Sequence, residues 1–94
     1  MVRDTYTWDD ASYTALAAAG VDWRDAQYVL YHSRPCVRSH LGSVLRVTAP
    51  DRNGQHLLVA LIEDTPDRYR VVGARLLDPA EQTAWQQMVK GEQP

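Results

Sequence analysis

Residues 67–89 read DRYRVVGARLLDPAEQTAWQQMV and contain the strongest local structure signals in the chain. Residues 69–72, YRVV, are aromatic and β-branched, a composition typical of a half-buried strand. Asp78, Pro79 and Glu81 then predict the start of a helix. Aspartate caps free amide groups, proline suits the first helical position, and the glutamate completes a capping box. The rest of the chain must therefore supply a sheet for this strand and a surface for this helix.

The pattern of residues before position 33 predicts two short helices. The first opens at residues 7–10 with Thr7 as its cap, and Gly20 ends it. Its apolar stripe consists of Trp8, Ala11, Ala15, Leu16 and Ala19. Asp22 caps a second helix over residues 23–31. Trp23, Ala26 and Leu30 form the inner stripe predicted for this second helix, with Val29 beside it.

The middle of the chain predicts a sheet. Residues 36–41 indicate a short edge strand, and residues 43–49 alternate apolar and polar side chains as in a half-buried strand. Residues 55–63 are apolar on both faces, as in a central strand, and Asn53-Gly54 favours a hairpin turn before them. The predicted fold is a single α+β domain over residues 1–94. It combines an antiparallel three- to four-stranded sheet with two N-terminal helices and one C-terminal helix, all packed on one face.

Composition excludes several classes of protein. The sequence has no apolar run near the roughly 20 residues that span a bilayer, so no membrane association is expected. The absence of a signal peptide and the single cysteine predict a cytoplasmic protein. Residues 34–75 contain seven arginines against four acidic residues, which suits an anionic partner. Acidic flanks and a pI of about 5.8 argue against direct DNA binding by this chain alone.

The order and spacing of several short motifs resemble the BrnT-type toxins, whose fold is similar to that of the RelE ribonuclease toxins. The resemblance covers about residues 6 to 88. It consists of Trp8-Asp9, Gly20-Val21, Ala26, Gly54, Leu57-Leu58-Val59, the strand motif at residues 70–75, Glu81 and Trp85. The resemblance implies a RelE-like fold and an RNA-cleaving toxin of a type II toxin–antitoxin system. It also implies a cognate antitoxin protein as partner and RNA, including mRNA, as substrate.

The chain departs from the BrnT pattern at three places. Ala18-Ala19 stands where the family has Lys-His, Leu76-Leu77 follows the strand motif where the family is arginine-rich, and Trp85 replaces a late tyrosine. Each replacement removes a charge or a group that can transfer a proton. These departures favour an alternative hypothesis, in which the chain is a non-catalytic protein-binding module of the same fold.

Metal-independent RNA cleavage requires cations that stabilise the charge developing on the phosphate, together with groups that transfer protons. We predict Arg70 and Arg75 as catalytic phosphate contacts and Arg46 and Arg68 as RNA-binding residues. Arg70 and Arg75 differ in parity, so a regular strand places them on opposite faces. A bulge at Gly73 would place them on the same face. The alternative is that these arginines are solvated or form ion pairs, with Glu63 and Glu81 as partners.

His56 is the predicted catalytic proton-transfer residue, because it lies in the strand next to Arg46 and histidine is the side chain best suited to gain and lose a proton near neutral pH. The alternative interpretation is a solvent-exposed histidine at the end of a hairpin. His32, Cys36 and His40 have side chains that bind zinc. Pro35, however, interrupts a helix before Cys36, and an extended chain separates Cys36 and His40 by about 13 Å. We therefore expect no metal site and no cofactor.

Overall fold

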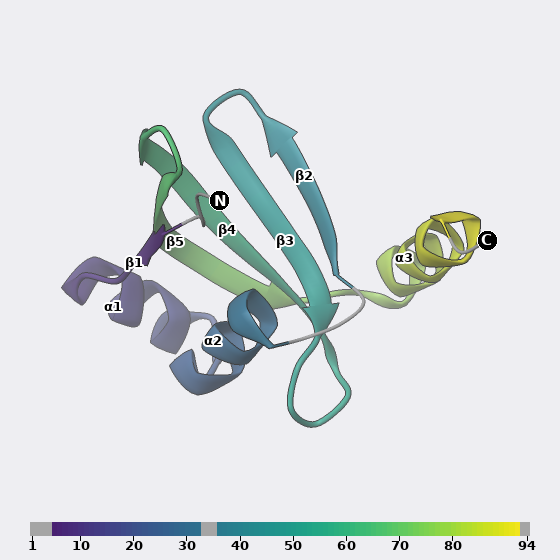
Figure 1. The fold of residues 1–94 in the computed structure, drawn as a ribbon. Coiled ribbons are helices and arrows are strands. Elements are labelled where there is room, and N and C mark those ends of the chain that lie inside the picture. Colours follow the sequence, from purple (N-terminus) through teal and green to yellow (C-terminus); the bar gives the residue numbers. More distant parts are fainter. Residues whose placement is uncertain (1–4, 33–35, 93–94) are drawn as a thin grey trace.

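The computed structural model describes residues 5–32 and 36–92, which form an α+β fold built on a five-stranded sheet. The sheet order is β1-β5-β4-β3-β2 (Figure 1). The elements in chain order are β1 (Thr5–Thr7), α1 (Asp10–Ala18), α2 (Trp23–Tyr31), β2 (Val37–Leu41), β3 (Val44–Pro50), β4 (His56–Thr65), β5 (Arg68–Leu76) and α3 (Pro79–Glu92). Among these described residues, no helix is long and apolar enough to cross a membrane.

Helix starts follow from local capping chemistry. The predicted starts of α2 and α3 are confirmed: the Asp22 side chain accepts from the amide of Arg24, and Asp78 and Glu81 exchange hydrogen bonds at 2.8 and 3.0 Å. The prediction that Thr7 caps the first helix is wrong. Asp9 is the cap, in a capping box with Ser12, because Thr7 belongs to β1 and donates its hydroxyl to the Tyr69 carbonyl.

Strands β2 to β5 form the predicted antiparallel meander, with each strand paired to the next. The prediction of a wholly antiparallel three- to four-stranded sheet is nevertheless wrong, because β1 adds a fifth strand parallel to β5. Thr5, Tyr6 and Thr7 pair with Arg68, Tyr69 and Arg70. A strand of three residues is too short to show a periodic pattern, and its pairing partners are distant in sequence.

Different helices pack on the two faces of the sheet. Helices α1 and α2 pack on one face, where Leu16 and Val29 meet the inward side chains of the strands. The main buried residues of the sheet on this face are Leu45, Val47, Ala49, Leu57, Val59, Leu61, Tyr69 and Val71. Helix α3 packs against the other face instead, so the prediction that all helices share one face is wrong (Figure 1). We call this second face the open face.

A bulge in β5 sets the direction of its arginine side chains. Ala60 pairs with Gly73 but the next residue, Leu61, pairs with Val71, so Val72 is the extra residue. Side-chain alternation therefore restarts within the strand: Val71 and Ala74 both point into the core. A Cβ added at Gly73 would meet no atom within 4 Å, so the bulge does not require a glycine there.

The buried hydroxyl of Ser12 supports this part of β5. Strand β1 pairs with β5 only as far as Arg70, so the backbone beyond that point needs another partner. The Ser12 hydroxyl donates a hydrogen bond to the carbonyl of Val71, the residue directly before the bulge. Ser12 is fully buried, whereas its position lies outside the apolar stripe predicted for the first helix. A polar contact thus fixes α1 against β5.

Candidate functional site

The predicted arginines lie in successive rows across the open face. Arg70 is opposite Ile62 in one row, Arg46 is opposite Ala60 in the next, and Arg75 is opposite Leu58 in a third. The bulge therefore places Arg70 and Arg75 on the same face, as predicted for a bulged strand, but the extra residue is Val72 and not Gly73. The rows of Arg70 and Arg75 are separated by about 13 Å along β4, at the usual rise per residue. The three guanidinium groups share a surface without converging on one point.

Arg75 is held by a carboxylate from α3. Its Nη1 and Nη2 atoms donate to Oε1 and Oε2 of Glu81 at 2.6 and 2.7 Å. This paired geometry is the strong form of an arginine–carboxylate contact. The Arg75 guanidinium and the Asp78 amide together lower the pKa of Glu81 to about 2. The alternative prediction, that Glu81 is an ion-pair partner of an arginine, is therefore confirmed for Arg75.

Arg70 also faces carboxylates, at longer distances. Its Nε lies 3.5 Å from Oδ2 of Asp64, and its Nη1 lies 3.9 Å from Oδ2 of Asp9. All of these side chains are more than a third exposed to solvent, so the pairs are screened and contribute little to stability. An anion can therefore compete for Arg70 at small cost. The predicted partner Glu63 forms no ion pair with any of the described residues.

Arg46 and Arg68 are the predicted site residues whose guanidinium groups have neither hydrogen bonds nor ion pairs within residues 5–32 and 36–92. Arg46 is exposed in the middle of β3, between Ser39 of β2 and Ala60 of β4. Arg68 is exposed at the start of β5, beside Thr65. Of the described cationic side chains without an ion pair, Arg46 lies nearest the centre of the open face.

His56 lies beneath α3. Its ring packs edge-on against the indole of Trp85, with ring centroids 4.6 Å apart, and the side chain is half-buried. The backbone carbonyl of His56 accepts a hydrogen bond from the amide of Leu77. The interpretation of His56 as a solvent-exposed residue is therefore wrong. The ring of Trp85 thus covers part of the imidazole.

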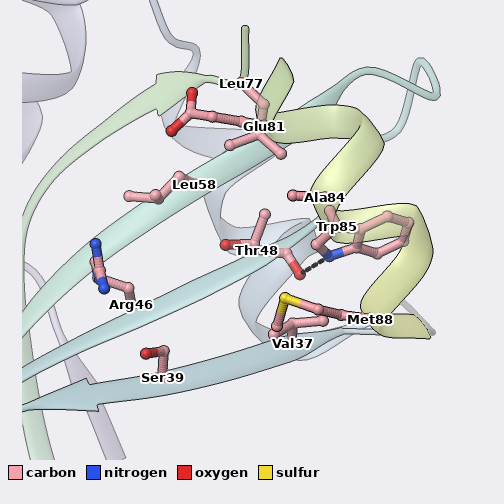
Figure 2. A pocket seen from close by; sticks show the side chains of 10 residues that line it. All are labelled: Val37, Ser39, Arg46, Thr48, Leu58, Leu77, Glu81, Ala84, Trp85 and Met88. Atoms are coloured by element: carbon pink, nitrogen blue, oxygen red, sulfur yellow. Dashed lines mark hydrogen bonds between the residues drawn. The ribbon is translucent and has the colours of Figure 1, made fainter. Parts of the chain in front are cut away.

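A pocket of about 280 Å³ lies between α3 and the open face (Figure 2). Leu58, Trp85 and Met88 are among its apolar walls, and Arg46 and Ser39 lie on the opposite side of it from α3. Trp85 is buried and donates its Nε1–H to the Thr48 carbonyl at 3.0 Å. Met88 of the same helix is 49% exposed, so the apolar side of α3 is only partly covered.

The residues considered as metal ligands have other environments. His32 ends α2, with its ring 6.0 Å from that of Tyr28, and His40 faces Tyr69 at 6.2 Å. Cys36 is half-buried against the core. Among the residues that the structure describes, no three histidine, cysteine or acidic side chains are grouped as metal ligands.

No protein-family model matches this chain, and no curated protein matches it.

Proposed function

We propose that this chain is the toxin of a type II toxin–antitoxin system, an RNA-cleaving ribonuclease similar to the BrnT and RelE toxins that a cognate antitoxin neutralises. One observation supports this proposal above the others. The bulge in β5 brings Arg70 and Arg75 to the sheet face that also bears Arg46. A single surface thereby presents three guanidinium groups, whose planar geometry suits phosphate oxygens.

In this proposal α3 covers the site in the absence of RNA. Glu81 of α3 pairs with the guanidinium of Arg75, and the indole of Trp85 in the same helix packs against the imidazole of His56. A phosphate group can replace Glu81 as the partner of Arg75, because both offer oxygen atoms to the same fork of N–H groups. Movement of α3 would then release His56 as well. His56 would accept the proton of the 2′-hydroxyl as its oxygen attacks the phosphorus, while the arginines stabilise the charge on the phosphate. The bond from phosphorus to the 5′-oxygen would then break, leaving a 2′,3′-cyclic phosphate, and the 5′-oxygen would take its proton from the protonated His56 or from water.

The test is induced expression of the chain alone in a bacterial host. The expected result is growth arrest that Arg75→Ala relieves while the amount of soluble protein stays equal. Arg52→Ala is the matched control: Arg52 also forms an ion pair at 2.6 Å, but with Asp25 of α2, away from the open face. Growth arrest that persists in Arg75→Ala, or that Arg52→Ala relieves equally, would contradict a function through the arginine face.

A second candidate function is a non-catalytic protein-binding module. The observation that favours it is the pairing of Arg70 and Arg75 with carboxylates, together with the covering of His56 by Trp85. Under this hypothesis the host grows normally although the folded protein accumulates. Purified protein would also leave RNA intact after Glu81→Gln has freed Arg75. RNA cleavage by the purified wild-type protein would exclude this second function.

A further inference from the structure

We propose that the pocket between α3 and the open face binds a segment of a partner protein in which a large apolar side chain lies close to a carboxylate. The apolar side chain would occupy the space beside Trp85 and Met88, and the carboxylate would pair with Arg46. Binding of such a segment does not require RNA cleavage, and it is compatible with either function proposed above.

The walls of the pocket select an apolar group. Leu58 and Val37 project from the strands, and Ala84, Trp85 and Met88 line the helix side (Figure 2). The polar atom of Trp85 is already used, because its Nε1–H donates to the Thr48 carbonyl. Trp85 therefore offers the pocket an apolar ring surface, and Met88 offers a flexible thioether that adapts to different shapes. Covering the half-exposed Met88 would remove apolar area from water.

The charge of the pocket selects a carboxylate. Two charged side chains line it, Arg46 and Glu81. The charge of Glu81 is compensated by the two-point contact with Arg75, whereas Arg46 has no ion pair within the described residues. The pocket therefore carries one uncompensated positive charge. A carboxylate next to an apolar wall is the complementary group, and an arginine fork binds it with paired hydrogen bonds.

A protein segment suits this pocket better than a nucleic acid strand. RNA strands are held by repeated phosphate contacts and by aromatic faces on which bases stack. Among the described residues, a single free cation borders the pocket, and Trp85 is only 7% exposed, with one side of its ring against His56. A segment that combines one apolar side chain with one acidic side chain satisfies both features of the pocket at once.

The experiment is a selection of peptides from a random displayed library against the full-length protein, followed by affinity measurements. We expect the enriched peptides to carry an aspartate or glutamate close to a large apolar residue. Arg46→Gln should weaken binding about tenfold, the loss typical of a hydrogen bond to a charged group. Arg68→Gln is the matched control, because Arg68 is an exposed, unpaired arginine outside the pocket, and its replacement should leave affinity within about twofold.

A double-mutant cycle separates direct pairing from a general charge effect. Replacing the acidic residue of the peptide with its amide should cost about tenfold against the wild type and almost nothing against Arg46→Gln. Met88→Glu should also weaken binding about tenfold, because it replaces part of the apolar wall on the α3 side of the pocket with a charged carboxylate. A selection without acidic binders overturns the inference. Equal effects of Arg46→Gln and Arg68→Gln, or additive effects in the cycle, overturn it too.

Discussion

Arg75 and Glu81 join the end of the sheet to the first turn of α3 through two parallel hydrogen bonds of 2.6 and 2.7 Å. Glu81 also accepts the amide of Asp78, so a single carboxylate serves both as helix cap and as ion-pair partner. The position of α3 and the availability of Arg75 are therefore linked. Any anion that binds Arg75 has to compete with a contact that also stabilises the start of the helix.

Replacing Glu81 with glutamine should increase the affinity of the protein for single-stranded RNA several-fold, because it leaves Arg75 without its carboxylate partner. The measurement is fluorescence anisotropy at fixed low salt, since phosphate contacts weaken as salt rises. Glu63→Gln is the matched control. It makes the same change of charge at an exposed residue of β4. An equal increase in RNA affinity in both variants would mean that the affinity depends on net charge alone and that Arg75 has no special role.

Stability at acidic pH should depend on Glu81. Its pKa is about 2 in the folded protein, below the usual value of 4.5, so the unfolded chain binds the proton more readily. The stabilisation is present above about pH 4.5 and is lost as pH falls toward 2. The difference in Tm between wild type and Glu81→Gln should therefore shrink across this range. An NMR titration of the Glu81 carboxyl carbon with a midpoint near 4.5 would contradict the assignment.

Trp85→Phe should loosen α3 and leave the rest of the fold intact. The phenyl ring retains much of the packing but cannot donate to the Thr48 carbonyl, and the loss of this hydrogen bond should cost about 1 kcal/mol. Hydrogen exchange should increase in the amides of α3 more than in those of α1. Trp23→Phe is the control, because Trp23 is 39% exposed and belongs to α2. Uniform acceleration of exchange would contradict the local role of Trp85.

Ser12→Ala should destabilise the protein by about 1–3 kcal/mol, because it leaves the Val71 carbonyl without its hydroxyl donor and removes part of the helix cap. Urea denaturation provides the measurement. The control on the same helix is Thr14→Ala, since the exposed Thr14 hydroxyl bonds only to the Asp10 carbonyl one turn earlier. Its cost should stay below about 0.5 kcal/mol. Equal costs would mean that the Ser12 contact with β5 adds no stability.

The parts of the fold that depend on local chemistry could be predicted from sequence. Asp22 and Asp78 fix the starts of α2 and α3 because caps act over a few residues, and the antiparallel meander follows from short turns such as Asn53-Gly54. Strand β1 could not be predicted, because three residues carry no periodicity. The face chosen by α3 could not be predicted either, since an apolar stripe does not specify which surface it covers.

The candidate site could also be predicted only in part, because its geometry depends on how the elements are arranged and not on local sequence alone. Arg70 and Arg75 could be named as charged residues of one strand, but their direction depends on whether Val72 is inserted as a bulge. The contact between Arg75 and Glu81 was one of two alternatives that the sequence left open. The contact of Trp85 with His56 depends on how α3 packs against the sheet. The spacing of side chains within α3 or within β4 does not determine this packing.

The parallel pairing of β1 with β5 has a consequence for how the chain folds during synthesis. Thr7 and Tyr69 are 62 residues apart in sequence, so β1 leaves the ribosome well before β5, the strand with which it pairs. Closing a loop of this length costs about 4 kcal/mol of chain entropy. The β2 to β5 hairpins close far shorter loops and can form earlier. Until β1 pairs with it, β5 exposes an open edge to other chains. The nascent protein is therefore most vulnerable to aggregation in the interval between the synthesis of β5 and the docking of β1.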